Sequence, residues 1–220
     1  MNQIVIVGGG IIGLSSAYFL AETGFKVTVL DRSDMREGCS YGNAGYLCPS
    51  HFAPLAAPGI VRQGLRWMLN QRSPFYIQPS LDTNLLNWGW HFVRSATARH
   101  VERSALPLRD ISLLSKHWYE QWLLEPDFDF YYEQKGMLEF FKTPANAHHA
   151  EATVHQAQTL GLDAALLDAA QVQALEPQTS LDILGAIHFR CDAHLNPGLM
   201  MEELKKRLLS VFLLVVSNSE

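Results

Sequence analysis

Three glycines near the N-terminus have the spacing that a phosphate-binding turn requires. Gly8, Gly10 and Gly13 follow one short apolar run and precede another. Gly8 permits a tight turn, Gly10 lets the backbone approach a pyrophosphate without a Cβ in the way, and Gly13 allows a helix to pack closely on strands. We expect the diphosphate at the start of that helix, where the unpaired N–H groups of Ile11 and Ile12 and the helix dipole favour an anion.

The residues around this turn predict a βαβ unit. Residues 4–7 form a β-branched run, which is typical of a strand buried on both faces of a parallel sheet. Apolar residues recur at helical spacing over 11–23, and Gly24 is placed to end that helix in a left-handed cap. Residues 27–30 predict the second strand. Nucleotide binding is therefore favoured over a glycine turn used only for packing.

An acidic residue follows the second strand, where the ribose of a nucleotide would be bound. The Asp31 carboxylate is expected to accept hydrogen bonds from the adenosine ribose hydroxyls. The next residue, Arg32, is included among the candidate cofactor-binding residues because it could meet the extra phosphate of NADP. A solvated arginine is the simpler interpretation of Arg32.

The complete spacing resembles the ADP-binding signature of the glutathione-reductase-like FAD oxidoreductases. Beyond the glycine turn, the matching residues are Ala17, Leu20, Gly24, Val27, Val29 and Asp31. That family usually has Glu at the last position, and either carboxylate can reach a ribose. The change to Asp keeps NAD as an alternative to FAD.

A loop of small residues after the second strand favours FAD over NAD. Ser40, Asn43, Ala44 and Gly45 could wrap a second phosphate or the flavin with backbone N–H groups, although from composition alone a plain surface loop is the better interpretation. This loop, together with residues 53–59 and 65–67, resembles the D-amino-acid dehydrogenases of bacteria. The resemblance implies that these four residues line the flavin side of the site.

The same resemblance implies FAD-dependent oxidative deamination of a small amino acid, with D-amino acids favoured. Glycine, sarcosine and hydroxyproline are the alternative substrates, and a nucleotide-binding module without catalytic activity is the alternative from another class. No catalytic residue is assigned. Arg66, Tyr131, Tyr132 and Arg190 are candidates to bind the substrate carboxylate, with solvated or packing roles as the default for each.

The expected fold class is α/β, with an FAD/NAD(P)-binding Rossmann-like domain interrupted by an α+β substrate domain. Residues 1–45 and 184–220 are assigned to the first domain and 46–183 to the insertion. Further expectations are helices over 60–69, 84–98, 106–124, 144–160 and 197–209, a short helix capped by Asp168 and Gln171, a hairpin over 129–133 and 137–142, and strands over 184–189 and 212–216. The parallel strands expected over 4–7, 27–30 and 212–216 are too few to bury both faces of a sheet. We therefore expect an incomplete nucleotide domain.

Composition excludes several other classes. With 17 basic against 22 acidic residues and a net charge of −5, the chain offers no broad cationic surface for nucleic acid. Its three cysteines and the histidines His148, His149 and His194 have no metal-ligand spacing, so no metal site is expected. Four glycines interrupt the apolar stretch over 4–21, which argues against a transmembrane segment. A cytoplasmic protein, with peripheral contact to the inner membrane as an option, fits these features.

Overall fold

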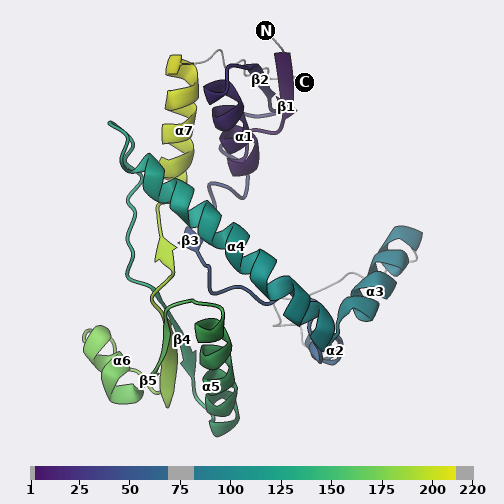
Figure 1. Cartoon of the computed structure of the whole chain (residues 1–220), viewed down its shortest axis with the longest axis vertical. Coiled ribbons are helices and arrows are strands. Elements are labelled where there is room, and N and C mark those ends of the chain that lie inside the picture. Colours follow the sequence, from purple (N-terminus) through teal and green to yellow (C-terminus); the bar gives the residue numbers. More distant parts are fainter. Residues whose placement is uncertain (1–2, 69–81, 212–220) are drawn as a thin grey trace. The chain divides into compact units, whose positions relative to one another are not determined.

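The computed structural model describes residues 3–68 and 82–211 and divides the chain into two compact units; its elements are labelled in Figure 1. The first unit consists of Met1–Leu47, Trp118–Met137 and Asp192–Glu220. The second consists of Cys48–His117 and Leu138–Cys191. Each unit is therefore assembled from segments that lie far apart in the sequence.

The first unit begins with the predicted βαβ arrangement. Strands β1 (Gln3–Val7) and β2 (Lys26–Leu30) are parallel and paired along their whole length. Helix α1 (Ile11–Glu22) connects them. Gly24 has φ +87°, a left-handed conformation that ends the helix as predicted and that a residue with a Cβ adopts only at a cost.

The C-terminal part of the described chain completes this unit. Strand β3 (Tyr46–Leu47) is antiparallel to β7 (Ala193–His194), and helix α7 (Pro197–Val211) follows. The Asn196 side chain accepts a hydrogen bond from the Leu199 N–H at 3.0 Å, which caps α7 where the Asn-Pro pair predicted its start. Figure 1 shows α7 lying beside α1.

The core of the first unit joins α1 and α7 to an aromatic cluster. Its most deeply buried members are Leu14, Ala17, Val29, Phe130, Met200, Met201 and Leu204, with Trp122 and Phe128 beside them. Burial of each large side chain stabilises the fold by about 1.5–3 kcal/mol. At the edge of this core, the Tyr18 hydroxyl donates to Glu125 at 2.6 Å, and Arg207 pairs with the same carboxylate at 2.9 Å. Burial and this hydrogen bond raise the pKa of Tyr18 to about 12.

Strand β1 is less buried than its sequence predicts. Val5 is 54% and Val7 is 85% exposed, so the expected burial on both faces is wrong for the part of the chain that the structure describes. Burial alternates along β1, so within the described residues the face that carries Gln3, Val5 and Val7 is exposed and only the opposite face is partly buried. No helix within 3–68 or 82–211 combines the length and apolar character needed to cross a bilayer.

The second unit combines helices with a small sheet. Its helices are α2 (Ile60–Met68), α3 (Thr83–Ser95), the greater part of α4 (Ala98–Trp122), α5 (Pro144–Thr159) and α6 (Ala169–Leu175). Its strands are β4 (Met137–Phe141), β5 (Ala164–Asp168) and β6 (Gly185–Phe189), in the order β4-β6-β5 with β5 antiparallel to β6. Two of the predicted helix starts are confirmed by their caps: Thr143 caps α5 before Pro144, and Asp168 and Gln171 form a capping box on α6.

Two predictions of secondary structure are wrong. Residues 129–133 form no hairpin with β4; Glu133 instead bridges to His194, and β4 pairs with β6. Left-handed φ values at Asp127 and Tyr131 prevent a regular strand there. Helix α4 begins at Ala98 rather than at 106, because the chain stays helical through Pro107. The strand expected over 212–216 lies outside the described residues.

Candidate nucleotide site

The turn between β1 and α1 depends on close backbone contacts. The Gly8 N–H donates to the Leu30 carbonyl at 2.8 Å, and Gly8 has φ +104°. A Cβ on Gly13 would lie 1.9 Å from the Gly8 carbonyl oxygen. Gly8 is therefore required for its conformation and Gly13 for the close approach of the helix to the turn, in agreement with the geometry of a dinucleotide-binding turn.

The start of α1 is capped by a residue that lies 29 positions later in the sequence. Gly10 occupies the cap position and offers no side chain, but the Ser40 hydroxyl accepts a hydrogen bond from the Ile11 N–H at 3.0 Å. A Cβ on Gly10 would lie 3.1 Å from this Ser40 oxygen. Gly10 has φ −75°, which any residue can adopt, so its value lies in the room it leaves and not in its backbone conformation.

We expect Ser40→Ala to lower the free energy of unfolding by about 1 kcal/mol, because it removes the acceptor that caps α1. Urea denaturation followed by circular dichroism measures this loss. Ser16→Ala is the matched control, since Ser16 is an exposed residue inside α1. An equal loss in both variants would contradict the capping role.

Asp31 anchors the turn from the end of β2. One carboxylate oxygen accepts the Gly9 N–H at 2.7 Å, and the other accepts the Ser33 N–H at 2.9 Å and its hydroxyl at 3.0 Å. These hydrogen bonds, the one from Gly9 first, hold the pKa of Asp31 below its ordinary value. A carboxylate has about four acceptor positions, so one remains on the oxygen beside Gly9 for the predicted ribose contact.

A pH dependence follows from the lowered pKa of Asp31. The stability contributed by its carboxylate is present above the ordinary pKa of 3.8 and is lost as pH falls through the lower folded-state pKa. We expect the free energy of unfolding of the native chain to exceed that of Asp31→Asn by a constant amount above about pH 5, and this difference to shrink below about pH 4. Urea titrations at several pH values measure it; a difference that grows in acid would contradict the assignment.

The loop expected to face the flavin is held by its own side chains. The Asn43 amide donates to the carbonyls of Cys39 at 2.8 Å and Ser40 at 3.1 Å, and its oxygen accepts the Gly45 N–H at 2.8 Å. Gly45 has φ +69°, and a Cβ there would lie 2.0 Å from the Leu195 carbonyl oxygen. Asn43 thus fixes the loop, and Gly45 permits its contact with the segment leading into α7.

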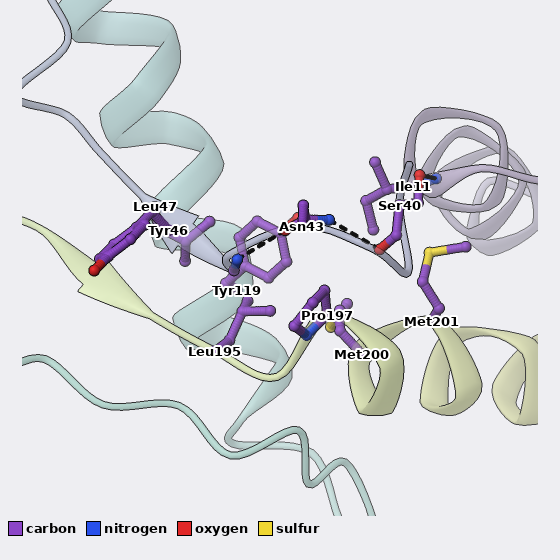
Figure 2. A pocket seen from close by; sticks show the side chains of 11 residues that line it. Ile11, Ser40, Asn43, Tyr46, Leu47, Tyr119, Leu195, Pro197, Met200 and Met201 are labelled. Atoms are coloured by element: carbon purple, nitrogen blue, oxygen red, sulfur yellow. Dashed lines mark hydrogen bonds between the residues drawn. The ribbon is translucent and has the colours of Figure 1, made fainter. Parts of the chain in front are cut away.

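A pocket of about 160 Å³ lies beside this loop (Figure 2). Four predicted residues line it: Ile11, Ser40, Asn43 and Gly45. The other predicted residues do not: Gly8, Gly10, Ile12, Gly13, Asp31, Arg32 and Ala44. Residues that the sequence did not single out complete the lining: Tyr46, Leu47, Tyr119, Leu195, Pro197, Met200 and Met201.

Four of the missed residues, Tyr119, Pro197, Met200 and Met201, come from helices that the sequence predicted without assigning them to the site. Tyr119 lies near the end of α4, and Met200 and Met201 lie on the first turns of α7. Figure 2 shows Met200 and Pro197 opposite the loop that carries Asn43. The Asn-Pro start of α7 was the one available signal, because it marks where the chain returns to the first unit.

Two of the four candidates for binding a substrate carboxylate have structural partners. The Tyr132 hydroxyl donates to Glu120 at 2.8 Å, and burial followed by this contact raises the pKa of Tyr132. Arg190 pairs with Asp163 at 3.3 Å. Tyr131 and Arg66 are exposed. Of the histidines, His194 lies 3.4 Å from the Glu133 carboxylate.

The turn fits the ADP part of FAD. The N–H groups in the first turn of α1 have no acceptor within the helix, and apart from Ile11 they are available to a pyrophosphate. A Cβ on Gly8 would meet no atom within 4 Å, so the space in front of the turn is open. The Ser40 to Gly45 loop continues from the turn to the pocket, which suits an extended cofactor.

Comparison with known proteins supports this assignment. Residues 3–211 match the DAO family model, described as FAD dependent oxidoreductase. The chain is 37% identical over 177 residues to D-amino acid dehydrogenase 2 of Ralstonia nicotianae, covering 80% of this chain and 42% of that protein. It is 30% identical over 219 residues to D-amino acid dehydrogenase of Helicobacter pylori, covering 100% of this chain and 52% of that protein. The chain thus spans about half the length of these relatives.

Solved structures show the same fold. Glycine oxidase from Geobacillus kaustophilus superposes with a TM-score of 0.64 at 16% identity, over 99% of this chain and 47% of that structure. L-proline dehydrogenase from P. horikoshii gives a TM-score of 0.61 at 16% identity, over 100% of this chain and 44% of that structure. These likenesses establish the fold alone. Because the family match covers most of its length, the chain belongs to the DAO family of FAD-dependent oxidoreductases.

Proposed function

We propose that this protein carries out the FAD-dependent oxidative deamination of a small amino acid, with D-amino acids as the preferred substrates. The observation that carries the proposal is a glycine turn between β1 and α1 that continues through the Ser40 to Gly45 loop into a pocket. The relatives named D-amino acid dehydrogenase favour this substrate class.

Residues of the first unit would hold the cofactor. The backbone of Gly10, Ile12 and Gly13 would bind the pyrophosphate beside Ile11, whose N–H donates to Ser40, and Asp31 would bind the ribose. Bound FAD supplies the hydride acceptor for oxidation of the substrate C–N bond, and the imine so formed hydrolyses to a keto acid and ammonia.

The pocket's own residues would position the cofactor and exclude water. Tyr119, Leu195 and Met200 give it an apolar side, and displacement of water from that side would strengthen the hydrogen bonds that the polar groups of the pocket make to a ligand. The ordered loop around Asn43 supports positioning rather than proton transfer, because its amide is committed to backbone partners.

Substrate class is tested by supplying the part of the fold that the chain does not span. The 220-residue chain is fused to the second half of the Helicobacter pylori relative, beginning where their similarity ends. With FAD and a dye acceptor, we expect the fusion to oxidise D-alanine faster than L-alanine, glycine, sarcosine or hydroxyproline.

The fused second half comes from a protein named for D-amino acids, so that protein, intact, is the control. A fusion that carries flavin but prefers glycine, sarcosine or hydroxyproline would assign the alternative substrate class. Flavin binding without oxidation of any of them, beside an active control, would favour a nucleotide-binding module.

In this assay the dye takes the place of the natural electron acceptor. The proposal also includes peripheral contact of the protein with the inner membrane face.

A further inference from the structure

The loop that leads from Asp31 to the pocket has no regular structure to hold it in place. Residues 36–44 contain neither helix nor strand. The hydrogen bonds of the Asn43 side chain join residues of the loop to one another, so they fix its shape but not its place in the first unit. The place of the loop must come from contacts with other elements of that unit.

Helix α7 supplies such contacts through one carboxylate oxygen. Glu202 Oε1 accepts hydrogen bonds from the Tyr41 hydroxyl at 3.1 Å and from Arg36 Nε at 3.0 Å, and Arg36 Nη2 lies 2.9 Å from the same oxygen. About one helical turn later, Lys205 Nζ donates to the Asp34 carbonyl at 2.8 Å. Glu202 and Lys205 lie on one face of α7, and together they hold both ends of the stretch 34–41.

The residue that caps α1 lies inside this stretch. Ser40 directly precedes Tyr41, and its hydroxyl accepts the Ile11 N–H at 3.0 Å. Tyr41 also packs against the core of the first unit, and a Cβ on Gly198 would lie 3.7 Å from its ring. Because Ser40 and Tyr41 are adjacent in the chain, a hold on Tyr41 limits the movement of the Ser40 hydroxyl at the start of α1.

The protonation states of these groups suit a lasting contact. Burial alone would raise the pKa of Glu202, but the hydrogen bonds from Tyr41 and Arg36 hold it below its ordinary value of 4.5. Burial, followed by the hydrogen bond to Glu202, raises the pKa of Tyr41 to about 12. At neutral pH the carboxylate is therefore ionised and the tyrosine hydroxyl keeps the proton that it donates.

We propose that Glu202 is a positioning residue of the cofactor site, which holds the Ser40 loop at the start of α1 through Arg36 and Tyr41. A loop that is ordered before its ligand binds loses less conformational entropy on binding, so these contacts should raise the affinity for FAD. Glu202 itself does not need to touch the cofactor. The gain in affinity rests on the proposed binding of FAD at the turn, whereas the placement of the loop does not.

Amide hydrogen exchange of the full chain, followed by NMR without any ligand, tests the placement of the loop. Glu202→Leu removes the acceptor oxygen and keeps a residue that favours a helix. The Ile11 amide should then exchange about tenfold faster, because its Ser40 acceptor is no longer held. The Gly8 amide, which donates to the Leu30 carbonyl, should exchange as before. Unchanged exchange of Ile11 would overturn the proposal, whether or not the protein binds flavin.

Quenching of flavin fluorescence measures the consequence for the cofactor. We expect Glu202→Leu to weaken FAD binding about tenfold, and Glu202→Gln to stay within about threefold of the native chain because glutamine keeps the accepting oxygen. Glu203→Leu is the matched control, since it removes the same charge from the next residue of α7 and Glu203 pairs with Lys206 of that helix. Equal losses in the two leucine variants would overturn the proposal.

A double-mutant cycle identifies the contacts through which Glu202 acts. In a chain that carries Arg36→Gln and Tyr41→Phe, Glu202→Leu should cause less than about a twofold further loss of FAD affinity, because its partners are already removed. A further loss of about tenfold would show that Glu202 acts in another way. Circular dichroism confirms that each variant folds; should Glu202→Leu not fold, the Arg36 and Tyr41 variants test the same contacts from the loop.

The two measurements separate this proposal from the proposed function. A native chain that binds no FAD would refute the cofactor site, and the exchange of Ile11 would still decide whether Glu202 places the loop. A native chain that binds FAD, with no loss of affinity in Glu202→Leu, would overturn the positioning role alone.

Discussion

Replacement of Gly13 by alanine is expected to destabilise the first unit by about 3 kcal/mol or more. The added Cβ would lie 1.9 Å from the Gly8 carbonyl oxygen and 3.1 Å from its carbon, both atoms of the backbone. No rotation of a side chain relieves such a contact, so α1 must move away from the turn. Urea denaturation followed by circular dichroism measures the loss.

Gly42→Ala is the matched control for this change. A Cβ on Gly42 meets no atom within 4 Å, and its φ is not in the left-handed region. The control should stay within about 0.5 kcal/mol of the native chain. A Gly13→Ala variant as stable as this control would show that α1 does not need the close approach.

Replacement of Gly10 by valine is expected to reduce FAD affinity about 100-fold, or about 2.8 kcal/mol, while the chain stays folded. The backbone of Gly10 tolerates any residue, and its Cβ would meet only the Ser40 hydroxyl, at 3.1 Å. The remaining methyl groups would occupy the space in front of the helix start that a pyrophosphate needs. Quenching of flavin fluorescence on titration measures the affinity.

Ser40→Ala separates two causes of that loss. If valine at Gly10 acted only by displacing the Ser40 hydroxyl, both variants would lose affinity equally. We expect Ser40→Ala to bind FAD much more tightly than Gly10→Val. Undiminished affinity in Gly10→Val would refute the phosphate-turn assignment.

Local patterns predicted the βαβ unit and most helices well. The β-branched run, the glycine turn and the cap at Gly24 depend on interactions between close neighbours in sequence, and the structure has each of them. The same holds for the capping box of Asp168 and Gln171, whose partners are three residues apart.

Contacts between distant residues were not predictable in this way. The helix expected over 106–124 is present, but the sequence could not show that its end packs in the first unit, where Trp118 and Trp122 lie against Phe19. Extended, aromatic residues 129–133 suggested a strand, yet Phe128 and Phe130 are buried in that same core. Apolar periodicity reports burial without naming the partner.

The candidate site shows the same division. Its glycines follow from local spacing, whereas Ser40 caps a helix 29 residues earlier and Asp31 holds the Gly9 N–H 22 residues earlier. A predicted ligand contact and an observed structural contact can therefore involve the same residue. The ribose contact of Asp31 stays a prediction.

The most direct test of the nucleotide site is a titration of the ¹⁵N-labelled chain with ADP, followed by amide NMR. ADP is the part of FAD that the βαβ unit would bind, so the measurement does not depend on flavin contacts from elsewhere. We expect saturable shifts of the amide signals of Gly8, Gly10, Ile11, Ile12 and Gly13, absent in Gly10→Val. Saturable binding that leaves these five signals unchanged, or no binding at all, would contradict the assignment.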